Sequence, residues 1–415
     1  MPEPIDPERR FEPSTLFGKA FAHLSRSAAP SSPLPPQAED RSANHPTQAP
    51  APGIAAHRGH HIIHGVAGSG KTTQLCAHAV QLAAMQAQSP HPRPILLLCY
   101  NEPLALWLQH EMRQRDLTGQ VLALHFHRWC REQLVAYHLE LPPRHMPAAE
   151  QIKNVVQRVT SALADGAIPA GQYAAVLVDE AHDFLPDWLA MLTQLPEPGN
   201  NHLVLSFDDA QSIYRRRRTR HIRLDGLGIA PANIRRLTGN QRNSAPIFNA
   251  ALRMAGDLLE PEERGEHGIP RLKPASDRQG GAAVQIFWMD HLREQGQQTA
   301  RLLRQAHAKG MAWGDMAVLC RNRFQMDVCH GALQQLGIPQ QLRHGAGEFD
   351  PAQDTVKIMS LQASAGLAFG LVVIIDSAEL PSTESEMEEK QRLLYIGATR
   401  ARHKLCLVGL KRQAG

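Results

Sequence analysis

The stretch that decides the fold is GVAGSGKT at residues 65–72, which fits the pattern G-x-x-x-x-G-K-[ST]. An apolar run at 61–66 leads into it, and a helical pattern follows it, with Leu75, Ala79 and Leu82 on one face. Glycines allow backbone N–H groups to surround phosphate oxygens, and the helix adds the positive end of its dipole. The sequence therefore predicts a phosphate-binding loop between a strand and a helix.

Two side chains of this loop carry the chemistry. We expect the Lys71 ammonium group to reach the β- and γ-phosphates of ATP, and the Thr72 hydroxyl group to bind Mg²⁺. The other loop residues predicted to bind the nucleotide are Gly65, Gly68, Ser69, Gly70 and Thr73.

A pair of carboxylates follows a second apolar run. The run at 174–178 ends in Asp179 and Glu180. We expect Asp179 to hold Mg²⁺ through water, and Glu180 to polarise the attacking water as a general base. Alone, two acids at the end of a strand are equally well explained as a solvated turn. Beside a phosphate loop, the catalytic interpretation is favoured.

Apolar runs alternate with helical patterns along the chain, which predicts parallel sheets covered by helices on both faces. The runs fall into two series, so we expect an α/β fold of two tandem lobes that divide near residue 236. The expected strands are 61–66, 95–100, 121–126, 174–178 and 203–207 in the first series, and 284–289, 316–320, 356–361, 371–376 and 404–408 in the second.

These series suggest a domain organisation. Residues 1–56 hold eleven of the thirty prolines and are expected to form a flexible leader. The first lobe is predicted at 57–235, with room for a small helical insertion at about 109–172. The second lobe is predicted at 236–415, without a large accessory subdomain.

The composition excludes several classes of protein. Hydrophobic residues make up 43% of the 415 residues, which excludes wholesale disorder. No apolar run approaches the roughly 18 residues needed to span a membrane. The six cysteines form no C-x-x-C pair, so a disulfide framework and a zinc site are disfavoured and a cytoplasmic location is expected. A net charge of +4 is too balanced to indicate a nucleic-acid-binding protein by itself.

Five further segments occur in order: ILLLCYNEPL at 95–104, HFHRWC at 125–130, DAQSIY at 209–214, NQRN at 240–243 and LYIGATRA at 394–401. With the phosphate loop, they resemble the motifs of superfamily 1 DNA helicases of the UvrD/Rep type. They look most like the small type often fused to a NERD nuclease-related domain. The resemblance implies two RecA-like P-loop lobes with the nucleotide between them.

The resemblance also implies catalytic roles. Gln211 is expected to sense the γ-phosphate and couple it to DNA, and Arg242 to contact the γ-phosphate. Arg400 is expected to be the arginine finger of the second lobe. Together with Lys71 and Glu180, these residues complete the predicted catalytic set, and Gly366 is a further expected nucleotide contact.

Contacts with a single strand of DNA, or of RNA, are expected from several of the same segments. The resemblance implies them for Asn101, His127 and Tyr214. Arg215 and Arg216 begin a basic cluster that extends to residue 223. A run of charges is commonly a solvated loop, but arginines that neutralise phosphates are a main source of affinity for nucleic acids, and we favour strand binding. Trp107 and Trp129 fit either base stacking or a packed core.

The sequence departs from the family pattern where adenosine and DNA are bound. Gln241 stands where the family has a tyrosine that stacks on adenine. In the degenerate fifth motif, SLQASAGLAF at 360–369, Gln362, Ala365 and Ala368 replace a histidine, a lysine and a glutamate. Arg216 stands where processive members have a base-stacking aromatic residue. A lost stacking contact costs about 1–3 kcal/mol per base, so we expect hydrolysis to survive better than nucleobase selectivity or mechanical coupling.

These observations favour a DNA-dependent ATPase that acts as a helicase or single-strand translocase, with 3′→5′ polarity if it follows its relatives. A nucleotide-binding regulatory switch without motor activity is the alternative, supported by the altered fifth motif. A small-molecule kinase is disfavoured, because it has no need for arginines from a second lobe. We expect a monomer that does not bind membranes and works with a nuclease or repair partner in trans.

Overall fold

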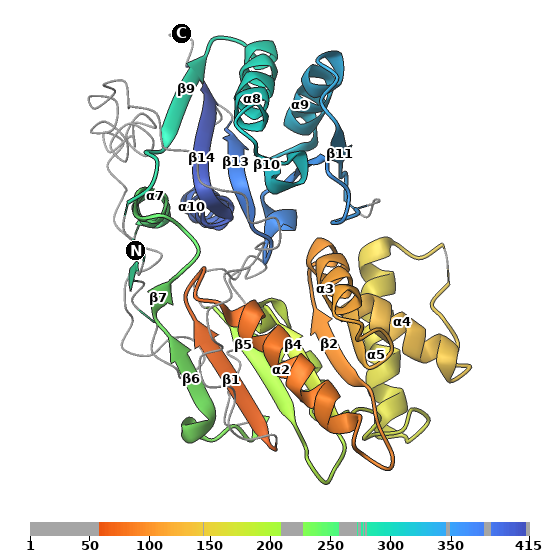
Figure 1. The fold of residues 1–415 in the computed structure, drawn as a ribbon. Helices are drawn as coiled ribbons and strands as arrows, with labels where there is room; N and C mark the ends of the chain where they lie inside the picture. Colours follow the sequence, from red (N-terminus) through yellow and green to blue (C-terminus); the bar gives the residue numbers. More distant parts are fainter. Residues whose placement is uncertain are drawn as a thin grey trace, which may run out of the picture.

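The computed structural model describes residues 58–143, 145–208, 227–256, 272, 275–276, 278, 280–345, 349–376 and 383–411. The predicted leader at 1–56 lies outside this part of the chain. Two six-stranded sheets dominate the described residues, one in each lobe (Figure 1). Every strand pair within these two sheets is parallel. The predicted α/β fold of two tandem lobes is therefore confirmed.

The first sheet has the strand order β3-β2-β4-β5-β1-β6. Its strands are β1 (His60–Gly65), β2 (Ile95–Cys99), β3 (Val121–His125), β4 (Ala175–Asp179), β5 (Leu203–Phe207) and β6 (Ile234–Leu237). Five of these runs match predicted strands to within a residue at each end. The edge strand β6 was not predicted, because its IRRL sequence is half polar and its side chains are only partly buried.

Helices cover both faces of this sheet. Successive strand residues point to opposite faces, so Leu97 packs with α2 (Lys71–Gln86) and α3 (Glu102–Gln114) on one side. Leu96 and Leu98 pack on the other side with α4 (Phe126–Ala136), α5 (Ala148–Ala164) and α6 (Pro186–Leu192). The helices α4 and α5 lie within the range where an insertion was expected, whereas β3 in that range belongs to the sheet.

The second sheet has the strand order β11-β12-β10-β13-β14-β9. Its strands are β9 (Gln285–Met289), β10 (Met316–Cys320), β11 (Gln340–Leu342), β12 (Val356–Ser360), β13 (Phe369–Ile375) and β14 (Ala401–Leu410). Its two faces are covered by α7 (Ala245–Ala255) with α10 (Glu384–Thr399), and by α8 (Leu292–His307) with α9 (Arg323–Gln335). A short pair, β7 (Gly239–Asn240) with β8 (Ala275–Ser276), stands apart.

Two details of the second lobe bear on the site. Arg400 alone separates the end of α10 from the start of β14, which begins three residues earlier than predicted. The connection from β11 to β12 holds no helix or strand in its described residues, and the buried Lys357 side chain fastens it by donating to the carbonyl groups of Asp350 and Gln353. This agrees with the absence of a large accessory subdomain at this position.

The chain passes between the lobes just after β6. This strand pairs with β1, so the first sheet extends to Leu237, and α7 already packs against α10 of the second lobe. None of the described helices is both long enough and apolar enough to cross a membrane. All six cysteines are buried and free.

Candidate functional site

The phosphate loop joins β1 to α2. Gly68 and Gly70 adopt left-handed backbone angles, with φ of 69° and 88°, and Gly70 precedes the first residue of the helix. A Cβ atom on Gly65 would lie 2.5 Å from Ser69 Oγ, and one on Gly68 would lie 2.6 Å from Asn240 Nδ2. Gly70 is therefore required by its backbone angle, Gly65 by the closeness of its neighbours, and Gly68 by both.

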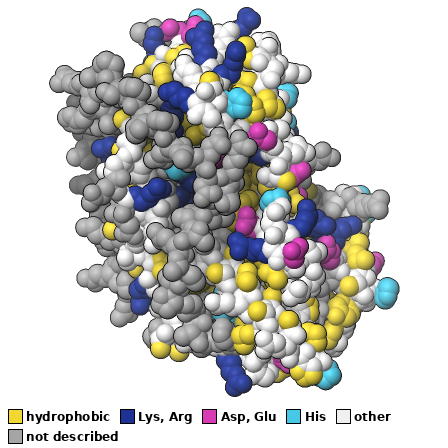
Figure 2. Space-filling view, in the orientation of Figure 1, with side chains coloured by type: hydrophobic (Ala, Val, Ile, Leu, Met, Phe, Trp, Pro, Cys, Tyr) yellow, Lys and Arg dark blue, Asp and Glu magenta, His cyan; other side chains and the backbone are white. Residues whose placement is uncertain are grey.

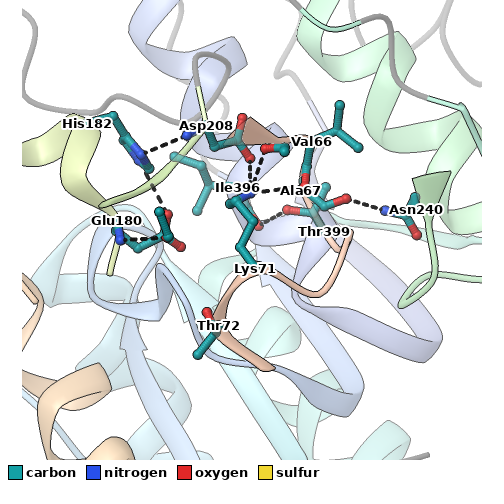
Figure 3. A network of polar contacts seen from close by, with 12 residues as sticks. Val66, Ala67, Lys71, Thr72, Glu180, His182, Asp208, Asn240, Ile396 and Thr399 are labelled. Atoms are coloured by element: carbon teal, nitrogen blue, oxygen red, sulfur yellow. Dashed lines mark hydrogen bonds and ion pairs between the residues drawn. The ribbon is translucent and has the colours of Figure 1, made fainter. Parts of the chain in front are cut away.

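Lys71 lies buried at the centre of the site (Figure 3). Its Nζ atom donates to the carbonyl groups of Gly65 at 2.7 Å and Val66 at 3.0 Å, and to Asp208 Oδ2 at 3.0 Å. An ammonium group has three donors, so these three acceptors satisfy it. Asp208, at the end of β5, was not predicted as a site residue.

The two residues predicted to bind Mg²⁺ lie in contact. The Thr72 hydroxyl donates to Asp179 Oδ2 at 2.7 Å, and the Ser206 hydroxyl donates to Asp179 Oδ1. Burial raises the pKa of Asp179, and the Glu180 carboxylate raises it further, while these two hydrogen bonds and Lys71 oppose the rise. A buried carboxylate beside a hydroxyl group is an oxygen donor set of the kind that Mg²⁺ prefers. These residues fit the predicted ion.

Glu180 has an unusual backbone. Its φ of 51° is left-handed, which a non-glycine residue rarely adopts. Its N–H group donates to Asp179 Oδ1 and Ser206 Oγ, which holds this conformation in place. The carboxylate is buried, and its Oε2 atom has no hydrogen-bond partner within the described part of the chain. Strain of this kind is typical of functional sites.

Two asparagines connect the phosphate loop to the second lobe. Asn240 Nδ2 donates to Ala67 O at 2.8 Å and to Asn243 Oδ1 at 2.7 Å. Asn243 Nδ2 in turn donates to the carbonyl groups of Thr399 and Ala401, on either side of Arg400. The sequence showed both asparagines, but their role as a bridge was not predicted.

Both predicted arginines lie at this seam. Arg400 is 1% exposed, and its guanidinium donates to Ile396 O at 3.0 Å and Thr399 Oγ1 at 3.0 Å. Arg242 Nη1 lies 3.4 Å from Thr399 O. The structure thus brings both arginines to the side of the site that faces Lys71.

Their buried environment disfavours the charged forms of both arginines. Burial and the nearby positive charge of Arg400 lower the pKa of Arg242 to about 9. Burial also lowers the pKa of Arg400, while the carboxylates of Glu180 and Asp208 oppose that change. Two neighbouring guanidinium groups in a buried site favour the binding of an anion, because it relieves their repulsion.

Asn101 of the first lobe contacts the second lobe, and Gly366 of the second lobe contacts the first. Asn101 Nδ2 donates to Ala363 O at 3.0 Å and to Ala365 O at 2.6 Å, in the fifth motif (residues 360–369) of the second lobe. A Cβ atom on Gly366 would lie 2.5 Å from Leu104 Cδ2 of α3. In the structure these two residues join the lobes, and the strand contact of Asn101 and the nucleotide contact of Gly366 stay predictions. The side-chain N–H groups of Asn101 are used by the two hydrogen bonds.

The aromatic residues near β3 form a cluster. His127 packs edge-on against Tyr100 and Trp188, with ring centroids 5.3 Å away in both cases. Burial lowers the pKa of His127 to about 4, and His125 adds to this effect, so His127 is neutral at pH 7. Trp129 is 1% exposed and donates to the Tyr173 hydroxyl group, which decides for the core interpretation of this residue.

The remaining predicted residues are placed as follows. Thr73 is exposed on α2. Gln211, Tyr214, Arg215 and Arg216 lie outside the described residues. On the face seen in Figure 2, Lys and Arg side chains are interspersed with Asp and Glu side chains.

Comparisons with known proteins point to the second lobe. Residues 340–412 match the family model of the UvrD-like helicase C-terminal domain. DNA helicase II of Escherichia coli and of Salmonella typhimurium is 41% identical over 73 residues, 16% of this chain and 10% of each relative. This chain therefore matches about a tenth of the length of these curated relatives.

A solved structure was also found: the C-terminal domain of a possible DNA helicase from Lactobacillus plantarum, 18% identical, with a TM-score of 0.26. The match covers 31% of this chain and 75% of that one. The family model and the two sequence relatives support a relation to UvrD/Rep-like helicases, and the residues that match the family model, 340–412, include the fifth motif at 360–369 and Arg400.

Proposed function

We propose that this chain hydrolyses ATP between its two lobes and uses the cycle to move along single-stranded DNA, as a superfamily 1 helicase or translocase. One observation carries the proposal. Asp208 pairs with Lys71 of the first lobe at 3.0 Å and interacts electrostatically with Arg400 of the second lobe. A cation of each lobe thus interacts with the charge of one carboxylate, Lys71 by direct contact and Arg400 electrostatically, and a triphosphate bound there would be held from two sides.

The first lobe supplies the phosphate and metal contacts. The loop at 65–72 would surround the phosphates with backbone N–H groups, and Lys71 would exchange Asp208 for a phosphate oxygen. Thr72 and Asp179 would hold Mg²⁺, which when bound neutralises phosphate charge. Glu180 would accept a proton from the attacking water, and its buried carboxylate suits this task.

The second lobe supplies the charge that promotes phosphoryl transfer. Arg242 and Arg400 would stabilise the equatorial oxygens of the transferred group, a contribution worth about 10³–10⁵ in rate for such arginines. Gln211 would couple the γ-phosphate to the strand. Because the arginines belong to the second lobe, their approach would depend on how the lobes are held together.

Strand binding is proposed for the surface near α3 and for the basic cluster at 215–223. On the face in Figure 2, the described Lys and Arg side chains are interspersed with Asp and Glu side chains, and the proposed affinity depends on this local cluster. We infer a 3′→5′ direction and a relation to the small NERD-associated type from the motifs alone. Weak nucleobase selectivity is inferred from Gln241, which stands in place of a stacking aromatic residue.

A regulatory switch is the second candidate, and a specific contact favours it. The fifth motif lacks the histidine and the glutamate of the family pattern, and Asn101 donates hydrogen bonds directly to the carbonyl groups of Ala363 and Ala365. A link between lobes that needs no strand would let nucleotide binding set the conformation without motor activity. We therefore expect any stimulation by DNA to decide between the two candidates.

ATP turnover measured with and without single-stranded DNA tests the proposal. A motor gives turnover stimulated many-fold by the strand, and a switch gives turnover that the strand hardly changes. Lys71→Ala is expected to abolish turnover, and Arg400→Gln to reduce kcat by about 10³-fold or more. Lys411→Ala, at an exposed lysine paired with Asp290, is the matched control.

The control for folding follows from the Lys71–Asp208 pair. Removing one partner of a buried ion pair is costly, about 3–5 kcal/mol, because it leaves the other charge unpaired. The double variant with Lys71→Ala and Asp208→Asn removes both charges. A folded double variant that still hydrolyses ATP at the normal rate would contradict the proposed function.

A further inference from the structure

His182 lies beside the proposed general base and has not been assigned a role. It belongs to the short helix η1 (Ala181–Asp183), two residues after Glu180, and is 5% exposed. Its ring packs edge-on against Phe207 of β5, with centroids 5.9 Å apart. The sequence pattern around the carboxylate pair did not indicate a role for this histidine.

A backbone hydrogen bond fixes the protonation of the ring. The N–H group of Asp208 lies 3.2 Å from His182 Nδ1 (Figure 3). A backbone N–H group can only donate, so Nδ1 must be the acceptor and must carry a lone pair. In the neutral ring, the proton then lies on Nε2. The geometry thus assigns His182 to the Nε2–H tautomer.

The Nε2 atom of His182 lies near the carboxylate of the proposed general base. His182 Nε2 lies 3.6 Å from Glu180 Oε2. This is the carboxylate oxygen that is buried and has no hydrogen-bond partner among the described residues. The backbone of Glu180 is held by Asp179 and Ser206, but those contacts do not fix the end of its side chain. An N–H donor 3.6 Å away would orient that end once the two groups approach to hydrogen-bond distance.

We propose that His182 is a positioning residue that aims the Glu180 carboxylate and ties it to Asp208, the partner of Lys71. The inference rests on the proposed function and deepens it. Through His182, the residue that would hold the phosphates and the residue that would activate water are linked at the end of β5. Release of Lys71 from Asp208 on nucleotide binding would then change the position of the Glu180 carboxylate through His182.

Two substitutions separate positioning from packing. His182→Gln keeps the chemistry, because an amide oxygen can accept from the Asp208 N–H group while the amide nitrogen donates toward Glu180. His182→Leu keeps apolar bulk and removes both polar functions. His78→Leu is the matched control, since His78 is a buried histidine of the same lobe that is hydrogen-bonded to His202 at 2.7 Å and has no assigned role in the proposed site.

We expect His182→Leu to lower kcat by about 10²-fold, the effect of misplacing a catalytic group by about 1 Å. The KM for ATP should change little, because Glu180 acts on water and not in nucleotide binding. His182→Gln is expected to restore most of kcat, and His78→Leu to lower the melting temperature while kcat stays normal. A packing role predicts instead that His182→Leu turns over at least as well as His182→Gln, which would overturn the inference.

A second readout does not depend on turnover. The ¹⁵N spectrum of the imidazole rings, assigned by difference with His182→Gln, is expected to show the Nε2–H tautomer, with a shift of Nε2 in Glu180→Gln. An Nδ1–H tautomer, or no response to Glu180→Gln, would overturn the inference. Absence of ATP turnover and of ATP binding in the wild type would instead reject the proposed function, which these spectra do not require.

Discussion

The Nζ atom of Lys71 and the Oδ2 atom of Asp208 lie 3.0 Å apart, although the two residues are 137 positions apart in the sequence. The side chains of both are nearly inaccessible to solvent, at 7% and 2% exposure. A phosphate group bound at the proposed site would need the same ammonium group. Nucleotide binding there would therefore compete with this internal ion pair.

The first prediction concerns that competition. In Asp208→Asn, Lys71 and Arg400 lose a neutralising charge, so we expect a lower melting temperature without ligand. Binding of ATP with Mg²⁺ should then raise the melting temperature more in the variant than in the wild type, because no carboxylate has to be displaced. Thermal unfolding with and without the nucleotide measures this difference. Equal gains in the two proteins would show that the ion pair does not oppose binding.

The second prediction concerns the contact between the lobes. Asn101→Ala removes two hydrogen bonds to the fifth motif, each worth about 1 kcal/mol. We expect the lobes to separate more readily, which fluorescence energy transfer between a dye on each lobe would detect as a longer mean distance. Gln109→Ala, which removes a hydrogen bond to Ala123 within the first lobe, is the control. An unchanged distance in Asn101→Ala would mean that other contacts hold the lobes together.

The third prediction concerns the pH dependence at Asp179. Because its pKa is raised in the folded protein, the folded state binds a proton there more tightly than the unfolded state does. The ionised carboxylate therefore costs stability near neutral pH, and this cost disappears as the pH falls and Asp179 takes up its proton. Asp179→Asn should melt at a higher temperature than the wild type at pH 7, with a difference that shrinks in acid. A constant difference across the pH range would contradict the assigned cause.

The fourth prediction concerns His127. Its pKa is lowered from 6.5 to about 4, so the unfolded chain binds this proton more tightly. The associated stability is fully present above pH 6.5 and is lost as the pH falls toward about 4, by at most about 3 kcal/mol. His127→Phe should flatten this part of the profile of unfolding free energy against pH. A profile as steep as that of the wild type would assign the loss to other groups.

The sequence predicted the framework of the fold because that framework depends on local patterns. Strand 203–207 and strand 316–320 match β5 and β10 at both ends, since buried parallel strands are continuous apolar runs. The phosphate loop was equally accessible, because its glycines, Lys71 and Thr72 are adjacent in the chain. The half-polar β6 and the three-residue β11 carry too little apolar pattern to be recognised.

The contacts that complete the site could not be predicted in the same way. Asp208 and the bridge between Asn240 and Asn243 act on residues far away in the sequence, and His182 is bound by Asp208, 26 positions along the chain. No local pattern reports such distances. The strand contact expected for Asn101 followed from the resemblance of residues 95–104 to a helicase motif. In the structure, Asn101 contacts the second lobe. The side chains of Ala363 and Ala365 in the fifth motif are small, which lets their backbone carbonyl groups reach the Asn101 amide.

The placement of Arg400 between α10 and β14 has a kinetic consequence. Arg400 is 1% exposed and its guanidinium is bound to the backbone of Ile396, so a change of side-chain rotamer would break contacts inside a packed site. Movement of the whole lobe would carry the guanidinium toward a substrate without breaking them. Side-chain flips take picoseconds to nanoseconds, whereas collective hinge motions take microseconds to milliseconds. The pace of each turnover would then be set by the swing of half the molecule.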